Sequence, residues 1–102
     1  MIIDDYIFYT KEYKQKYGDK TIVLMQVGSF FELYSIFDDT DNELYKIADI
    51  CNITISKKNK TILEVSNRNP LMAGFPLYTI NKYQNILLQN NYTIVMIEQV
   101  SE

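Results

Sequence analysis

The stretch TIVLMQVGSFFELYSIF, from Thr21 to Phe37, decides the fold of this chain. Residues 21–27 are mostly β-branched and apolar, residues 30–37 form an aromatic run, and Gly28-Ser29 separates the two. Two runs of this kind around a glycine-containing link are typical of strands joined at a tight turn, because glycine accepts the backbone angles that such a turn requires. The stretch therefore predicts two strands joined at a tight bend.

Helical patterns lie on both sides of these strands. Before them, a segment starting near Asp4 carries tyrosines at four-residue spacing, and Gly18 is placed to end the helix. After them, Thr40 with Glu43 three residues later forms a capping box, and apolar residues at helical spacing continue to Cys51. These signals predict an amphipathic helix before the strand pair and a second helix after it.

The rest of the chain alternates between short strands and one more helix. Ile53–Ser56 and Thr61–Val65 predict a hairpin around a polar loop, and Leu71–Pro76 predicts a short strand or tight turn. Thr79 is placed to cap a third helix, and Tyr92–Val100 predicts a strand covered on both faces. The buried stripe expected for that helix consists of Ile80, Tyr83, Ile86 and Leu87. The pattern predicts an α/β or α+β domain, with a mixed sheet flanked by about three helices.

Length and composition describe one globular unit. A chain of 102 residues and 12.0 kDa can bury one compact core but not two, so a single domain is expected over residues 1–102. Hydrophobic residues make up 47% and charged residues 23%, which excludes a disordered or collagen-like chain. The net charge is −3, whereas a free-standing nucleic-acid binder is expected to be basic. Composition therefore argues against autonomous DNA binding.

Missing residue types narrow the chemistry further. Cys51 is the one cysteine, which excludes an internal disulfide and a multi-cysteine zinc site and predicts a small core residue. The chain has no histidine, which excludes hydrolysis by a Ser/His or Cys/His pair. The segment Gly18-Asp19-Lys20-Thr21 lacks the first glycine of a P-loop and has no lysine directly after its glycine, so no ATP site is expected in this domain.

The segments that would direct a chain to a membrane are missing from the sequence. The longest apolar runs are far shorter than the roughly 18 residues of a membrane span, and the N-terminus MIIDDYIFY is acidic where a signal peptide is positively charged. An intracellular protein without membrane partners is therefore expected.

An acidic patch before the second helix offers one catalytic alternative. Its residues are Asp38, Asp39, Asp41 and Glu43. Carboxylates of this kind bind divalent cations, so a small metal-dependent nuclease is an open alternative. The favoured interpretation is structural, because acidic side chains at a helix start interact well with the helix dipole, and the glycine-centred pattern of a calcium loop is missing. No metal site is predicted.

Phe30 and Glu32 form the most informative pair. In a strand they project to one face, while Phe31 and Leu33 project to the other face and into the core. An aromatic ring beside a hydrogen-bonding group can stack on a base and test its edge. Taken alone, the pair favours a core phenylalanine next to a solvent-exposed carboxylate.

Four motifs in this order resemble the N-terminal mismatch-recognition domain of MutS proteins. They are GSFFELY (28–34), ITISKK (53–58), PLMAGFPLY (70–78) and VMIEQV (95–100), with a tyrosine-containing helix before them. The resemblance extends over almost the whole chain. It implies a MutS-like domain excised from a longer protein, which recognises double-stranded DNA with mismatches or small loops during DNA mismatch repair.

The resemblance also implies residue roles. Phe30 corresponds to the wedge that enters the minor groove and stacks on a mispaired or unpaired base, and Glu32 to the carboxylate that hydrogen-bonds that base. Lys57, Lys58, Lys60 and Arg68 are expected at phosphates, and Leu71 or Met72 in the groove. No residue of the domain is expected to be catalytic and no cofactor is expected in it. ATP and Mg²⁺ belong to other domains of a dimeric parent, which is expected to be a DNA-dependent ATPase in a DNA-containing compartment.

Three departures from the family pattern point to a divergent viral or organellar branch. Ser29 stands where many members carry Asp, the stretch from Ser35 to Asn42 is longer, and a histidine common near Tyr78 is absent. Besides the nuclease, one alternative is a protein-interaction or scaffold domain of the same fold that has lost contact with DNA. The net charge favours that alternative, and a buried Phe30 would support it.

Overall fold

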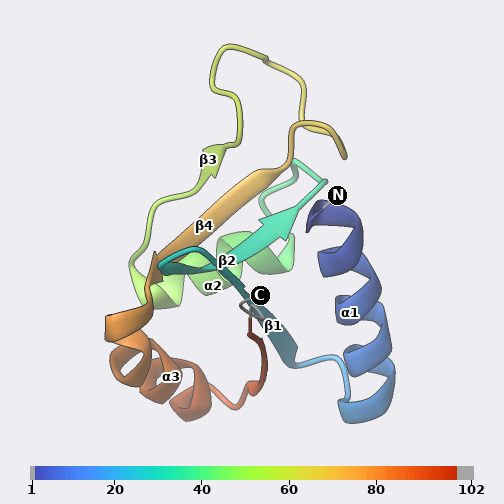
Figure 1. Cartoon of the computed structure of the whole chain (residues 1–102). Coiled ribbons are helices and arrows are strands. Elements are labelled where there is room, and N and C mark those ends of the chain that lie inside the picture. Colours follow the sequence, from blue (N-terminus) through green and yellow to red (C-terminus); the bar gives the residue numbers. More distant parts are fainter. Residues whose placement is uncertain (1, 99–102) are drawn as a thin grey trace.

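The computed structural model describes residues 2–98, and Figure 1 shows their arrangement. The helices are α1 (Ile2–Tyr17), α2 (Glu43–Cys51) and α3 (Ile80–Gln89), with a short 3-10 helix η1 (Leu77–Thr79) before α3. The strands are β1 (Thr21–Val27), β2 (Phe30–Ser35), β3 (Ser56–Lys57), β4 (Leu71–Pro76) and β5 (Thr93–Ile97).

The strands form one mixed sheet in the order β3-β4-β2-β1-β5. Neighbouring strands run antiparallel except β1 and β5, which are parallel and are connected through the rest of the domain. Val27 pairs with Phe30 across the two-residue link, which confirms the tight bend predicted from the sequence. The predicted α/β class with a mixed sheet and three helices is confirmed.

Helices pack on both faces of the sheet, and each face is covered only in part. The α2 and α3 helices pack on the face that carries Phe31, Leu33 and Phe75, and α2 lies behind β2 in Figure 1. The α1 helix packs mainly on β1, and its Tyr6 ring meets Tyr34 at the end of β2. The part of this second face that carries Phe30, Glu32, Met72 and Gly74 is less covered, and we refer to it as the open face.

The start of α2 differs from the predicted capping box. The helix begins at Glu43, and Asn42 is its N-cap, accepting hydrogen bonds at Oδ1 from the Leu44 and Tyr45 amides at 2.9 and 3.3 Å. Asn42 also donates to the Phe37 carbonyl at 2.8 Å. Thr40 is an exposed residue before the helix, so the predicted Thr40 cap is wrong.

The predicted hairpin between Ile53–Ser56 and Thr61–Val65 is also wrong. Of these residues only Ser56 is in a strand, in β3, which pairs with the start of β4 instead. Residues 58–69 form a loop without strands, organised by the buried side chain of Asn69. Its amide accepts from the Asn59 N–H at 2.8 Å and donates to the carbonyls of Ile62 and Glu64. These bonds satisfy backbone groups that a hairpin would pair between strands.

Two details at the C-terminal end depart from the prediction. Thr79 makes no capping bond to the amides of α3; its hydroxyl donates to the Pro76 carbonyl and closes η1. In the predicted helical stripe Leu87 is buried and its other members are half-buried. Strand β5 is a sheet edge with Met96 40% exposed, so the prediction of two covered faces is wrong. Gln99 and Val100 of the predicted strand lie outside the described residues.

Candidate functional site

The tip of the β1–β2 hairpin presents Phe30 to solvent. Gly28 has a φ of 60°, as the first position of a type II′ turn requires, and this explains why a glycine stands there. The Leu77 amide donates to the Ser29 carbonyl at 2.9 Å and ties the turn to the end of β4. Phe30 lies between the paired residues Val27 and Pro76, and 43% of it is exposed. The ring is therefore accessible on a backbone held from both sides.

Strand alternation separates Phe30 from its neighbour Phe31. Phe31 is 6% exposed, and its ring centroid lies 6.1 Å from that of Phe75. The Phe75 ring in turn stacks on Tyr83 of α3. Phe30 points to the opposite face, together with Glu32. The predicted division of this strand into a core face and a free face is confirmed.

The carboxylate of Glu32 is held by Tyr34, two residues further along the same face. The Tyr34 hydroxyl donates a short hydrogen bond to Oε1 of Glu32. Glu32 pairs with Gly74 across β2 and β4, and a Cβ at position 74 would lie 3.3 Å from Glu32 Cγ and 2.6 Å from the Phe31 carbonyl oxygen. Gly74 therefore allows β2 and the stem of Glu32 to lie against β4.

Tyr34 is anchored from the side of α1. It is 8% exposed, and the Tyr6 ring meets it edge-on with 5.3 Å between ring centroids. The Tyr6 hydroxyl donates to the Val23 carbonyl at 2.9 Å. Burial first, and then the hydrogen bond with the Glu32 carboxylate, raises the pKa of Tyr34 well above its ordinary value. Tyr34 is thus a neutral hydrogen-bond donor throughout the physiological pH range.

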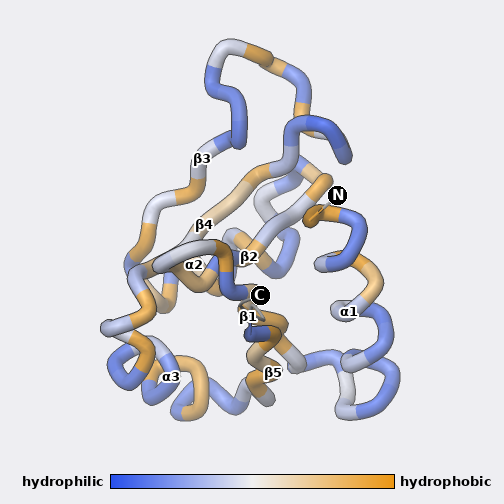
Figure 2. Tube along the Cα trace, in the orientation of Figure 1, coloured by the Kyte–Doolittle hydropathy of each residue, from blue (hydrophilic) through white to orange (hydrophobic). Residues whose placement is uncertain are grey.

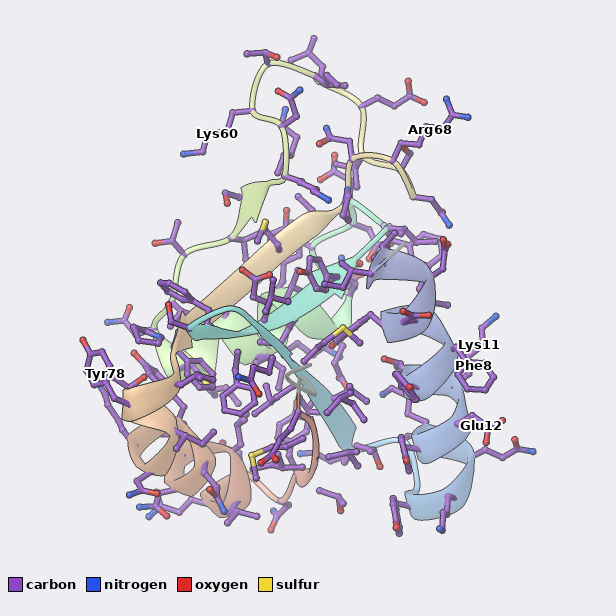
Figure 3. All side chains as sticks on the ribbon, viewed as in Figure 1. Phe8, Lys11, Glu12, Lys60, Arg68 and Tyr78 are labelled. Atoms are coloured by element: carbon purple, nitrogen blue, oxygen red, sulfur yellow. The ribbon has the colours of Figure 1, made fainter. Side chains whose placement is uncertain are left out.

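The 58–69 loop carries the basic side chains at the far end of β4. Lys58, Lys60 and Arg68 are exposed, and Figure 3 shows Lys60 and Arg68 projecting from opposite sides of the loop. The loop is mostly hydrophilic with a few apolar residues (Figure 2), of which Leu63 is 87% exposed. Phe30 lies at the other end of the strand pair, because Phe30 pairs with Pro76 and Ser35 with Leu71.

The remaining residues predicted for the site are not equivalent. Met72 is half-buried on the open face, two residues from Gly74 on the same strand. Leu71 is 4% exposed and faces the core, so the surface at this position offers Met72 rather than Leu71. Lys57 is half-buried in the edge strand β3, directly opposite Leu71.

The acidic patch follows the end of β2 and leads into α2. Asp38, Asp39 and Asp41 are exposed between β2 and α2, and Glu43 forms an ion pair with Lys14 of α1 at 3.0 Å. Among residues 2–98, no group of three or more acidic or cysteine side chains is arranged to hold a metal ion. Cys51 is buried in the core, as predicted, and burial raises the pKa of its thiol.

Comparison with known proteins gives the family. Residues 7–102 match the domain described as MutS domain I, which spans the exposed Phe30, Glu32 and the basic loop. The chain belongs to the MutS domain I family. A DNA mismatch repair protein mutS homolog of Acanthamoeba polyphaga mimivirus is 30% identical over 101 residues, covering 95% of this chain and 9% of that protein.

Other relatives of this MutS domain I have the same partial coverage. The DNA mismatch repair protein MutS of Petrotoga mobilis is 32% identical over 89 residues, 87% of this chain and 9% of that protein. The mitochondrial DNA mismatch repair protein mutS homolog of Sarcophyton glaucum is 26% identical over 112 residues, 93% of this chain and 11% of that protein. The resemblance read from the motifs is confirmed, and the chain spans about a tenth of the length of these relatives.

The MutS domain I also contains functional candidates that sequence patterns did not single out. These are Tyr34, Gly74 and Asn69. A glycine inside a strand is a known signal of close backbone approach, so Gly74 was recognisable in principle. Strand alternation places Tyr34 on the same face as Glu32, whereas the bonds that Asn69 makes within the 58–69 loop have no recognised sequence signal. Within residues 2–98 no helix is long and apolar enough to cross a membrane.

Proposed function

We propose that this domain recognises mispaired or unpaired bases in double-stranded DNA during mismatch repair. Phe30 enters the minor groove and stacks on the base, and Glu32 hydrogen-bonds the edge of that base. The observation that carries the proposal is the exposure of Phe30 at the tip of a fixed hairpin, with Glu32 on the same face. An exposed apolar ring on a backbone held in this way is suited to insertion between bases.

Deformability of the DNA would supply the selectivity. Inserting an apolar side chain unstacks a base step, which costs a few kcal/mol, and this cost is lowest where pairing is already defective. Stacking on an aromatic ring stabilises the complex by about 1–3 kcal/mol and tolerates any base, because every base has a π-face. A wedge at Phe30 thus detects weakened stacking rather than sequence.

The basic loop would hold the duplex at a distance from the wedge. Ser35 lies five positions after Phe30 along β2, which is about 17 Å at a rise of roughly 3.3 Å per residue. This distance corresponds to about five base pairs of DNA. In the proposal, Lys58, Lys60 and Arg68 meet phosphates half a helical turn or more from the inserted ring, with Lys57 and Met72 between them and the hairpin tip.

A longer parent protein completes the proposal. The chain spans about a tenth of the relatives, so we propose that residues 1–102 are one domain of a MutS-like protein. The domain itself has no catalytic role. An ATPase with its Mg²⁺, and the contacts of a dimer, belong to other domains, and the protein works in an intracellular compartment that contains DNA. The scaffold alternative lacks the support that a buried Phe30 would have given it, because 43% of Phe30 is exposed.

The test is DNA binding by the complete protein with Phe30→Ala. Affinities for a heteroduplex with one mismatch and for the matched homoduplex are measured by fluorescence anisotropy. Loss of stacking worth about 1–3 kcal/mol predicts a roughly 5- to 150-fold weaker heteroduplex complex, with the homoduplex affinity nearly unchanged.

Phe8→Ala is the matched control, because Phe8 is another exposed ring, on the outer side of α1 (Figure 3). It should leave both affinities unchanged. Unaltered discrimination between the two duplexes in Phe30→Ala would refute the proposed function.

A further inference from the structure

We propose that Tyr34 is a positioning residue that determines how well the domain discriminates mismatches, by holding the Glu32 carboxylate in the orientation that meets a base. The inference rests on the proposed function of Phe30 and Glu32. Burial alone would suggest that Tyr34 only packs in the core.

The geometry confines Glu32 from two directions. Tyr34 lies two residues away on the same strand face, and its hydroxyl donates to Oε1. On the neighbouring strand, Gly74 leaves the space over which the stem of Glu32 lies, since even a methyl group there would approach Cγ to 3.3 Å. The carboxylate is thus oriented before DNA binds.

The hydrogen bond from Tyr34 occupies one of the two carboxylate oxygens of Glu32. Oε1 accepts from Tyr34, and in the proposal this leaves Oε2 to accept from a base stacked on Phe30. Without Tyr34 the carboxylate rotates more freely, and ordering it on binding lowers affinity. Because a matched duplex does not present an extruded base edge, this loss falls on the heteroduplex complex.

Tyr34 is itself held rigidly enough for the task. Its ring is buried against Tyr6, and the Tyr6 hydroxyl is engaged with the Val23 carbonyl instead of with Glu32. Glu32 and Tyr6 are the titratable groups whose charges act on Tyr34, and burial keeps the pKa of Tyr34 far above neutrality. The donor therefore stays protonated wherever the DNA complex is stable.

Tyr6→Phe provides a control, which removes the bond to the Val23 carbonyl and keeps the bond from Tyr34 to Glu32. Both substitutions remove one buried hydroxyl from the same pair of rings, yet only Tyr34→Phe frees Glu32. The experiment measures heteroduplex and homoduplex affinities of the complete protein for Tyr34→Phe, Tyr6→Phe, Glu32→Ala and the Tyr34→Phe/Glu32→Ala double variant. Far-ultraviolet circular dichroism confirms that each variant is folded.

The expected result is a roughly 3- to 10-fold lower ratio of heteroduplex to homoduplex affinity in Tyr34→Phe, and an unchanged ratio in Tyr6→Phe. In the Glu32→Ala background Tyr34→Phe should have no further effect, because the group that it positions is gone. A wild-type ratio in Tyr34→Phe, an equal loss in Tyr6→Phe, or a full Tyr34→Phe effect without Glu32 would each overturn the inference.

The same assay separates this inference from the proposed function. If Phe30→Ala keeps its discrimination, the proposed function itself fails. If Phe30→Ala loses discrimination while Tyr34→Phe keeps it, the wedge stands and only the positioning role of Tyr34 is wrong.

Discussion

Gly74→Ala tests whether the close approach of β2 and β4 at Glu32 matters for the fold. The added methyl carbon would lie 2.6 Å from the Phe31 carbonyl oxygen, a backbone atom. An ordinary contact between carbon and a carbonyl oxygen is about 3.3 Å, so one strand has to move by about 0.7 Å. Overpacking of this kind destabilises a protein by about 1–3 kcal/mol, whereas replacing glycine itself stabilises by roughly 0.4–1 kcal/mol through the unfolded chain.

The net expectation for Gly74→Ala is a loss of about 1–2 kcal/mol in the free energy of unfolding. In urea unfolding of the 102-residue chain, followed by circular dichroism, the midpoint should fall by roughly 0.5–1 M. Gly28→Ala is the comparison for backbone strain without a clash: a Cβ at Gly28 meets no atom within 4 Å, but side chains rarely adopt its positive φ. A midpoint that stays constant or rises in Gly74→Ala would refute the reasoning.

Two further predictions concern the tyrosines and the basic loop. The pKa values of Tyr6 and Tyr34 are raised above the ordinary 10.0, mainly by burial, so above pH 10 the unfolded chain releases protons that the folded chain retains. Their stabilising contribution is complete below pH 10 and declines as the pH rises, by about 1.4 kcal/mol per pH unit for each tyrosine. Tyr34→Phe should reduce this slope in urea titrations between pH 10 and 11.5, and an unchanged slope contradicts the assignment. Asn69→Ala removes the bonds that hold the 58–69 loop, so we expect a loss of about 1–3 kcal/mol and faster tryptic cleavage after Lys58 and Lys60. Asn67→Ala, an exposed neighbour, should change neither property, and equal behaviour of the two variants would contradict the role given to Asn69.

Local chemistry was sufficient to predict the central hairpin. A glycine at the first turn position, β-branched residues before it and aromatic alternation after it all favour the same structure, and the observed pairing of Val27 with Phe30 follows from them. The end of α1 is equally local: Gly18 has a φ of 109° and its amide donates to the Lys14 carbonyl at 2.8 Å. Signals of this kind need no knowledge of the rest of the chain.

The errors occur where distant residues compete with a local pattern. Thr40 and Glu43 have the spacing of a capping box, but Asn42 combines a cap with a hydrogen bond to the Phe37 carbonyl, and this fixes the later start. Thr61–Val65 has strand propensity, but Asn69, several residues further on, binds the backbone carbonyls there. β-propensity is weak when a buried polar side chain offers better partners.

In the candidate site too, some features follow from local sequence and others depend on packing. The side on which Phe30 and Glu32 project follows from strand alternation, which is a property of two neighbouring residues. The hydrogen bond from Tyr34 to Glu32 requires α1 to bury the tyrosine ring, and the space over Gly74 requires β4 beside β2. Alternation therefore identifies the two candidate binding side chains, and only tertiary structure identifies the residues that orient them.

The net charge of −3 does not decide whether this domain meets DNA, because the charges are unevenly distributed. Residues 56–69 contain four of the ten basic residues and one of the thirteen acidic residues, so this end of the molecule is positive while the remainder is strongly negative. At physiological ionic strength charges are screened over about 8 Å, and the domain measures 37 × 34 × 26 Å. A phosphate at the loop therefore senses Lys58, Lys60 and Arg68 far more than acidic residues that lie several times this distance away. A few cations neutralise few phosphates, so under the proposed function most of the affinity for the duplex comes from other parts of the complete protein, and the hairpin contributes the test of the base.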